Sequence, residues 1–267
     1  MKVDEINPLL KSGGIIALDQ SPEHAKAMSE MAIEVIRAAM SFDPSELTVY
    51  TDPDKDYDPM SVNGVDQYPY LTPGDGWRDD EINGGRGIRF PNDMYPGDIN
   101  RNTIMHFSDD PNEIIGLPFQ LHKLARMAVS TSRHTAMLLR REGIDPDRLS
   151  LLTRAILYPA QPSVQNYESD VPVALKDHSD KGAWTVTDLE TGPGFEYLNA
   201  VGDFVSPATG NYLFAADLSG HTANRHRVNQ KLIDGSSVHA DLDPVLNQRL
   251  SCSPYARLAI IRFYREL

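Results

Sequence analysis

The second half of this 267-residue chain is a series of short apolar segments separated by turns, and this pattern most constrains the fold. The segments are rich in β-branched and aromatic residues and are bounded by Gly, Pro, Asn or Asp, as is typical of β-strands. They are Leu149–Tyr158, Val173–His178, Trp184–Leu189, Phe195–Leu198, Tyr212–Ala216 and Arg257–Tyr264. So many short strands, separated by turns, predict a sandwich or barrel.

Two long helices are predicted in the first half. Residues Glu23–Ser41 carry apolar side chains at helical spacing, and Ser21 and Pro22 supply a cap and a proline for the first turn. Residues Leu117–Glu142 have the same periodicity, and Gly143 follows as a stop. Between them, residues 52–112 are dense in Asp, Gly, Pro and Tyr, which predicts loops and short strands that help to shape a pocket.

Composition excludes several classes of partner and compartment. The formal net charge is −13, from 25 basic and 38 acidic residues, which argues against nucleic acid and anionic membranes as partners. Cys252 is the single cysteine, so no intrachain disulfide can form, as suits a reducing compartment. No secretory signal and no apolar run of membrane-spanning length is visible. We therefore expect a cytoplasmic protein, and the sequence gives no indication of its oligomeric state.

Three residues of the strand-rich half have the pattern of a metal site. His178 and Asp180 are two residues apart, and on a strand this spacing directs both side chains to the same face. His226, 46 residues after Asp180, can supply a second imidazole, with His221 as the alternative. Two histidines and one carboxylate form the facial triad that holds Fe(II) and leaves coordination positions open. The candidate metal ligands and catalytic residues are therefore His178, Asp180 and His226.

Four motifs follow one another in this half. They are Ile156-Leu157-Tyr158-Pro159, then His178-Ser179-Asp180-Lys181-Gly182-Ala183-Trp184-Thr185, then Gly210-Asn211-Tyr212-Leu213 with Ser219-Gly220 and His226-Arg227-Val228, and finally Arg257-Leu258-Ala259-Ile260-Ile261-Arg262-Phe263. The step from Asn211 to His226 is 15 residues. In sequence and order these motifs resemble those of the iron(II)/2-oxoglutarate-dependent oxygenase family, in its isopenicillin N synthase-like branch.

The resemblance implies a fold. The expected class is α+β, mainly β, with a double-stranded β-helix (jelly-roll) core over residues 148–267 and the N-terminal helices packed outside it. Residues 1–147 would form a helical buttress and pocket loops. The whole chain, residues 1–267, would be a single oxygenase domain.

The resemblance also implies an activity. The enzyme would bind Fe(II) and the cosubstrate 2-oxoglutarate, use O2 to oxidise a small-molecule substrate, most simply by hydroxylation, and release succinate and CO2. Desaturation and cyclisation belong to the same chemistry. Tyr158 and Arg257 are the implied 2-oxoglutarate-binding residues, and a guanidinium suits that role because its rigid donor fork matches a carboxylate.

The chain departs from the family pattern near the arginine. Arg257 lies 31 residues after His226, farther than in the family, and Ala259 stands where the family has serine. A second register pairs His239 with Arg249 and Ser251, but the Ser-Cys-Ser-Pro run that follows is unsuited to a buried central strand. We therefore predict an insertion from Asn229 to roughly Tyr255.

These departures leave other functions open. One is an oxoglutarate-independent Fe(II) oxidase or cyclase of the same fold, and another is a non-catalytic jelly-roll binding protein. His24 and His134 have no partner at ligand spacing, and Arg86 and Arg89 are candidates for contact with an acidic substrate.

Overall fold

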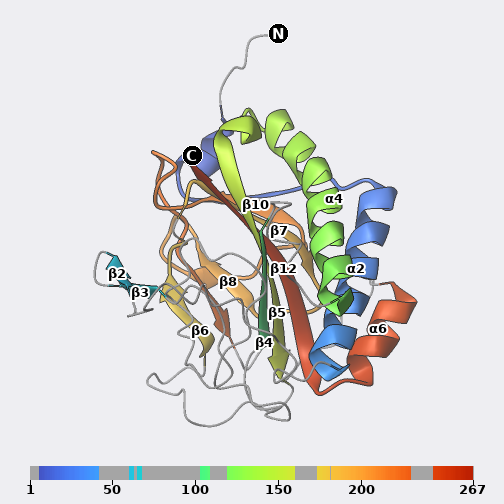
Figure 1. Ribbon diagram of the computed structural model, residues 1–267. Coiled ribbons are helices and arrows are strands. Elements are labelled where there is room, and N and C mark those ends of the chain that lie inside the picture. The colour runs from blue at the N-terminus through green and yellow to red at the C-terminus, as the bar shows by residue number, and fades with distance from the viewer. Residues whose placement is uncertain are drawn as a thin grey trace.

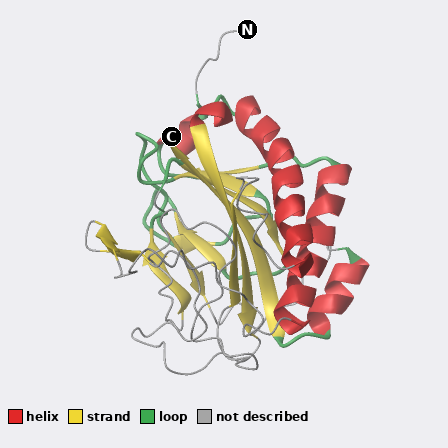
Figure 2. Ribbon diagram, in the orientation of Figure 1, coloured by secondary structure: helices red, strands yellow, loops and turns green. Residues whose placement is uncertain are grey.

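The computed structural model describes residues 6–41, 60–62, 65–67, 103–108, 119–159, 173–180, 182–229 and 243–266. In these ranges the long helices cover one side of a large antiparallel sheet, and a smaller sheet lies on the other side (Figures 1 and 2). Most of residues 52–112, with Arg86 and Arg89, lies outside the described residues, as does His239.

The large sheet has six strands in the order β1-β10-β7-β12-β5-β4. Their bounds are Ile15–Ala17 (β1), Thr103–Ser108 (β4), Leu149–Pro159 (β5), Trp184–Glu190 (β7), Tyr212–Ala215 (β10) and Tyr255–Glu266 (β12). Strand β12 pairs antiparallel with β5 on one side and β7 on the other. Its register places Arg257 directly opposite Tyr158.

The smaller sheet has four strands in the order β6-β11-β8-β9. Their bounds are Val173–His178 (β6), Phe195–Leu198 (β8), Phe204–Val205 (β9) and His226–Asn229 (β11). Strands β6 and β11 are antiparallel, and their register sets His226 opposite His178. A separate hairpin joins β2 (Met60–Val62) to β3 (Val65–Gln67).

The helices are α1 (Pro8–Lys11), α2 (Pro22–Ser41), α4 (Phe119–Arg141), the 3-10 turn η2 (Pro146–Arg148) and α6 (Pro244–Ser251). Gly143, at φ +80°, follows α4 in a left-handed conformation that glycine adopts without steric cost. No helix among these described residues is both long enough and apolar enough to cross a bilayer.

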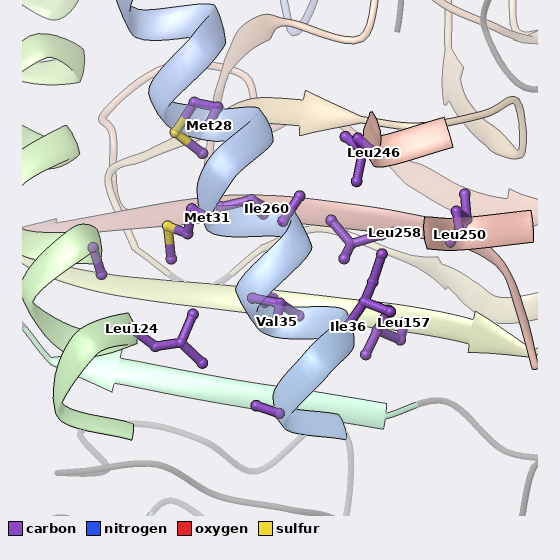
Figure 3. Close-up of a cluster of buried hydrophobic side chains, with 14 of the residues drawn as sticks. Met28, Met31, Val35, Ile36, Leu124, Leu157, Leu246, Leu250, Leu258 and Ile260 are labelled. Atoms are coloured by element: carbon purple, nitrogen blue, oxygen red, sulfur yellow. The ribbon is translucent and has the colours of Figure 1, made fainter. Parts of the chain in front are cut away.

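The main apolar core lies between the helices and the large sheet. Met28, Met31, Val35 and Ile36 of α2 pack with α4 and α6 over the helix-facing side chains of β5 and β12 (Figure 3). Strand alternation explains the pattern in β12, because Leu258 and Ile260 belong to this core whereas Arg257 and Ala259 point to the other face. The face away from the helices is therefore free to build a site.

A buried ionic network lies within this helix–sheet interface. Arg262 of β12 and Asp188 of β7 are both 0% exposed and form an ion pair. Arg262 also donates to Thr131 and to Thr153, and Asp188 accepts from Thr135 at 3.0 Å. Nε2 of His24 in α2 lies 3.6 Å from Oδ1 of Asp188, so the network ties both long helices to the middle of the sheet.

Most elements predicted from the sequence are confirmed. The two long helices and the six strands occur within a few residues of their expected bounds. The helices α1 and α6 and the strands β1, β9 and β11 were missed, and α6 lies inside the predicted insertion. Two strands that precede residue 148, β1 and β4, also join the large sheet.

Candidate metal centre

The three predicted metal ligands meet at one end of the smaller sheet. His178 is the last residue of β6, and His226 is the first residue of β11, directly opposite. Asp180 lies just beyond the end of β6. From the sequence we expect His178 and Asp180 to lie within one strand, but they lie on either side of the strand end. Its backbone carbonyl accepts a hydrogen bond from the N–H of Asp217 at 3.0 Å, which fixes the turn.

Their side chains converge on a common point. The Nε2 atoms of His178 and His226 each lie 3.6 Å from Oδ1 of Asp180. One potential ligand atom from each residue lies within 4.8 Å of the other two, and this is the one such cluster of His, Cys, Asp or Glu among the described residues. His226 and Asp180 are buried, whereas the His178 side chain is 36% exposed. The site is therefore enclosed on one side and open on the other.

The protonation states of Asp180 and His226 suit a metal site. Burial alone would raise the pKa of the Asp180 carboxyl, but His226, His178 and Thr185 outweigh it and hold the pKa well below its ordinary value. Burial lowers the pKa of His226 to about 4, against the opposing effect of Asp180. At neutral pH the site thus offers an ionised carboxylate and a neutral buried imidazole, the forms that bind metals.

Thr185 supports the carboxylate. Its hydroxyl donates a hydrogen bond to Oδ2 of Asp180 at 2.7 Å, and the other carboxylate oxygen, Oδ1, faces the two imidazoles. Both residues are buried, so this hydrogen bond orients the ligand without competition from water. The H-x-D-x-G-x-x-T motif contains Thr185, but the sequence alone assigned it no role.

Two aromatic rings enclose His226. The ring centroids of Phe195 and Phe214 lie 5.1 Å and 5.0 Å from that of His226. Phe195 also contacts Tyr212, at 4.8 Å between centroids. His221, the alternative ligand, instead lies against Trp184, a buried core residue, at 5.6 Å between ring centroids.

Through Glu190, Tyr212 is connected to the two residues predicted to bind 2-oxoglutarate, Tyr158 and Arg257. The Arg257 guanidinium lies over the Tyr158 ring, 4.5 Å from its centroid. Arg257 forms a buried ion pair with Glu190 of β7, which also accepts a hydrogen bond from the Tyr212 hydroxyl at 2.8 Å. Neither Glu190 nor Tyr212 was assigned a role from the sequence. An acidic residue at an inward-facing position of a buried strand is the signal that could have singled out Glu190.

The competing arginine lies elsewhere. Arg249 is exposed on α6, and α6 packs against α2 on the helix side of the large sheet. Arg257 is 1% exposed and faces the same interior as Tyr158.

Structural comparison places this arrangement among solved proteins. Dioxygenase for auxin oxidation 1 from Arabidopsis thaliana, solved as a binary complex with 2-oxoglutarate, matches with a TM-score of 0.55 at 13% identity, over 97% of this chain and 85% of that chain. The chain has the fold of the 2-oxoglutarate-dependent dioxygenases. A full-length Neurospora crassa protein, solved with α-ketoglutarate and 5-formyluracil, matches this dioxygenase fold at a TM-score of 0.53 and 15% identity, over 96% of this chain and 76% of that chain. No family model and no curated protein matches the sequence.

The dioxygenase fold confirms the resemblance drawn from the four motifs at the level of the fold. Within it, the structure brings His178, Asp180 and His226 together and, separately, Tyr158 and Arg257. Phe195 and Tyr212 connect the two groups through ring contacts and the hydrogen bond to Glu190.

Proposed function

We propose that the protein is a non-haem Fe(II)/2-oxoglutarate-dependent dioxygenase that oxidises a small molecule, most simply by hydroxylation, with release of succinate and CO2. The observation that carries the proposal is the convergence of two imidazole nitrogens and one carboxylate oxygen within 4.8 Å in this fold. The two solved neighbours support it, because their complexes contain 2-oxoglutarate, and one also contains 5-formyluracil, a small molecule.

The donor set fits Fe(II). Two neutral imidazoles and one carboxylate are the ligands of the facial triad of such oxygenases, and three protein ligands leave positions for a chelating cosubstrate and oxygen. His178, Asp180 and His226 would hold the ion, and Thr185 would keep Oδ1 of Asp180 directed at it. A bound metal would also relieve the electrostatic cost of burying the Asp180 charge.

Arg257 and Tyr158 have the chemistry to bind a keto acid. Nη1 of Arg257 is buried and has no hydrogen-bond partner, so it is a donor available to a carboxylate. Tyr158 packs against the guanidinium and fixes its plane. When bound at the metal, 2-oxoglutarate would supply the electrons for oxygen activation, and Arg257 would hold its distal carboxylate.

Other residues would control access to the metal. Phe195 and Phe214 are 5% and 1% exposed and would keep water from one side of His226. His178 lies at the exposed side, where substrate and oxygen would enter. We further propose that the two sheets form the double-stranded β-helix (jelly-roll) core of one domain spanning residues 1–267.

The test is anaerobic addition of Fe(II), then 2-oxoglutarate, to the purified protein while the visible spectrum is recorded. We expect a weak metal-to-ligand charge-transfer band only when both are present, and succinate release once a substrate is supplied. Asp180→Ala should abolish Fe(II) binding while the far-UV circular dichroism spectrum stays unchanged.

The matched control is Asp177→Ala. Asp177 is an exposed carboxylate three residues from Asp180 that pairs with Arg225, so its removal should leave Fe(II) affinity almost unchanged. Iron binding without the band would favour the oxoglutarate-independent oxidase. Unchanged iron binding in Asp180→Ala would reject the triad and favour a non-catalytic binding protein.

A further inference from the structure

Glu190 contacts Arg257, the arginine proposed to bind the cosubstrate. Its side chain is almost fully buried, pairs with Nη2 of Arg257 and accepts a hydrogen bond from Tyr212. A buried carboxylate is costly unless it is paired. Here the partner is the same cation that would bind the distal carboxylate of 2-oxoglutarate.

The remaining donors of Arg257 are limited. A guanidinium has five N–H groups, directed along a fixed fork. Nη2 is taken by Glu190, and Nε points to the carbonyl oxygen of Gly192 at 3.4 Å. Nη1 is buried and has no hydrogen-bond partner. A carboxylate that binds Arg257 would therefore find Nη1 available, because the Glu190 carboxylate already binds Nη2.

Glu190 is held in place by its surroundings. Tyr212 is 0% exposed, and burial together with the Glu190 charge raises its pKa well above the ordinary value, so it stays a hydrogen-bond donor. Gly210 packs directly behind Glu190, because a Cβ at Gly210 would lie 2.9 Å from the backbone oxygen of Glu190. The Glu190 carboxylate is thus held in a fixed position beside Arg257.

The charge balance has a consequence for binding. Arg257 and Glu190 together carry no net charge, so a dicarboxylate gains less here than at an unpaired arginine. Two carboxylates about 5 Å apart at an effective dielectric constant of about 20 repel strongly enough to change an affinity on the order of a hundredfold.

We propose that Glu190 is a specificity-determining residue of the cosubstrate site, which weakens the preference for a dicarboxylic over a monocarboxylic 2-oxo acid by neutralising Arg257. The proposal rests on the proposed function, because it takes Arg257 as the cosubstrate clamp. It predicts that the wild-type protein discriminates poorly between 2-oxoglutarate and 2-oxovalerate, which has a methyl group in place of the distal carboxylate.

The experiment measures the dissociation constants of both acids for the Fe(II)-loaded protein under anaerobic conditions, by the charge-transfer band and by calorimetry. Glu190→Gln removes the charge but keeps an acceptor for Arg257 and Tyr212. It should tighten 2-oxoglutarate binding roughly tenfold or more and leave 2-oxovalerate binding unchanged. The matched control is Glu196→Gln, since Glu196 is also a buried carboxylate paired with an arginine, Arg227, but belongs to a different cluster. It should change neither constant.

Two results would overturn the proposal. One is a Glu190→Gln protein that binds 2-oxoglutarate no more tightly than wild type, which would make Glu190 a purely structural partner of Arg257. The other is a wild-type protein that prefers 2-oxoglutarate over 2-oxovalerate by roughly a hundredfold or more. This second measurement needs no variant, so it also decides the case in which Glu190→Gln does not fold. If the Fe(II)-loaded wild type and Glu190→Gln bind neither acid, the cosubstrate assignment fails as well, and this result is distinct from the first two.

Discussion

Breaking the buried ion pair between Asp188 and Arg262 should be among the most destabilising single changes in this protein. Both side chains are 0% exposed, and Arg262 forms further hydrogen bonds that keep it in place. Asp188→Asn would leave a buried guanidinium without its counter-charge, which typically costs about 3–5 kcal/mol. Since 1 kcal/mol shifts the melting temperature of a domain of this size by about 2–4 °C, the expected loss is roughly 6–20 °C.

The measurement is urea and thermal unfolding followed by circular dichroism at neutral pH. Asp147→Asn is the matched control, because Asp147 pairs with Arg140 at the surface and should change stability by less than about 1 kcal/mol. The double variant Asp188→Leu/Arg262→Met should recover much of the loss, since neither charge then needs to be buried. A loss below about 1 kcal/mol for Asp188→Asn, or a double variant no more stable than the single one, would refute the reasoning.

Three further predictions concern single sites. Thr185→Val should weaken Fe(II) binding about 10–100-fold in an anaerobic titration, because it removes the hydrogen bond that orients Asp180, and an unchanged affinity would contradict this role. Gly210→Ala should destabilise the protein to urea by about 1–3 kcal/mol, because the new Cβ would meet the Glu190 backbone at 2.9 Å. Burial, and to a smaller extent the charge of the nearby His24, lowers the pKa of His134 below its ordinary value of 6.5. The imidazole therefore binds a proton more readily in the unfolded chain than in the folded protein. Its contribution to stability should be complete above about pH 6.5 and be lost as pH falls toward the folded-state pKa. The stability difference between wild type and His134→Gln should therefore change over that range, and a constant difference would disprove it.

The elements that could be predicted from sequence are those with a strong local signal. The α2 and α4 helices have long apolar periodicity with clear ends, and β5 and β12 are long and predominantly apolar. The α6 helix was missed because its eight residues lie in a polar segment, although Asp243 caps it by accepting from the N–H of Val245 at 2.8 Å. Short strands such as β1 form through pairing with distant partners, which local pattern does not reveal.

The metal triad was predictable for a different reason. His178, Asp180 and His226 carry rare side chains at a recognisable spacing, and the framing motifs indicate which histidine is involved. The pairing of Glu190 with Tyr212 has no such spacing signal, because it depends on the register between β7 and β10. Asp188 and Arg262 likewise meet across two strands and beneath two helices, so their partnership follows from packing alone.

The position of β12 also bears on how the protein reaches its native state. This strand is the last in chain order among those described, yet it fills the gap between β5 and β7, pairing Glu266 with Leu149 and Tyr264 with Trp184. Contacts between residues so distant in sequence slow folding, because the intervening chain must be ordered first. Until β12 is in place, β5 and β7 each present an unpaired edge, which favours association between chains. We therefore expect slow refolding with losses to aggregation that increase with protein concentration.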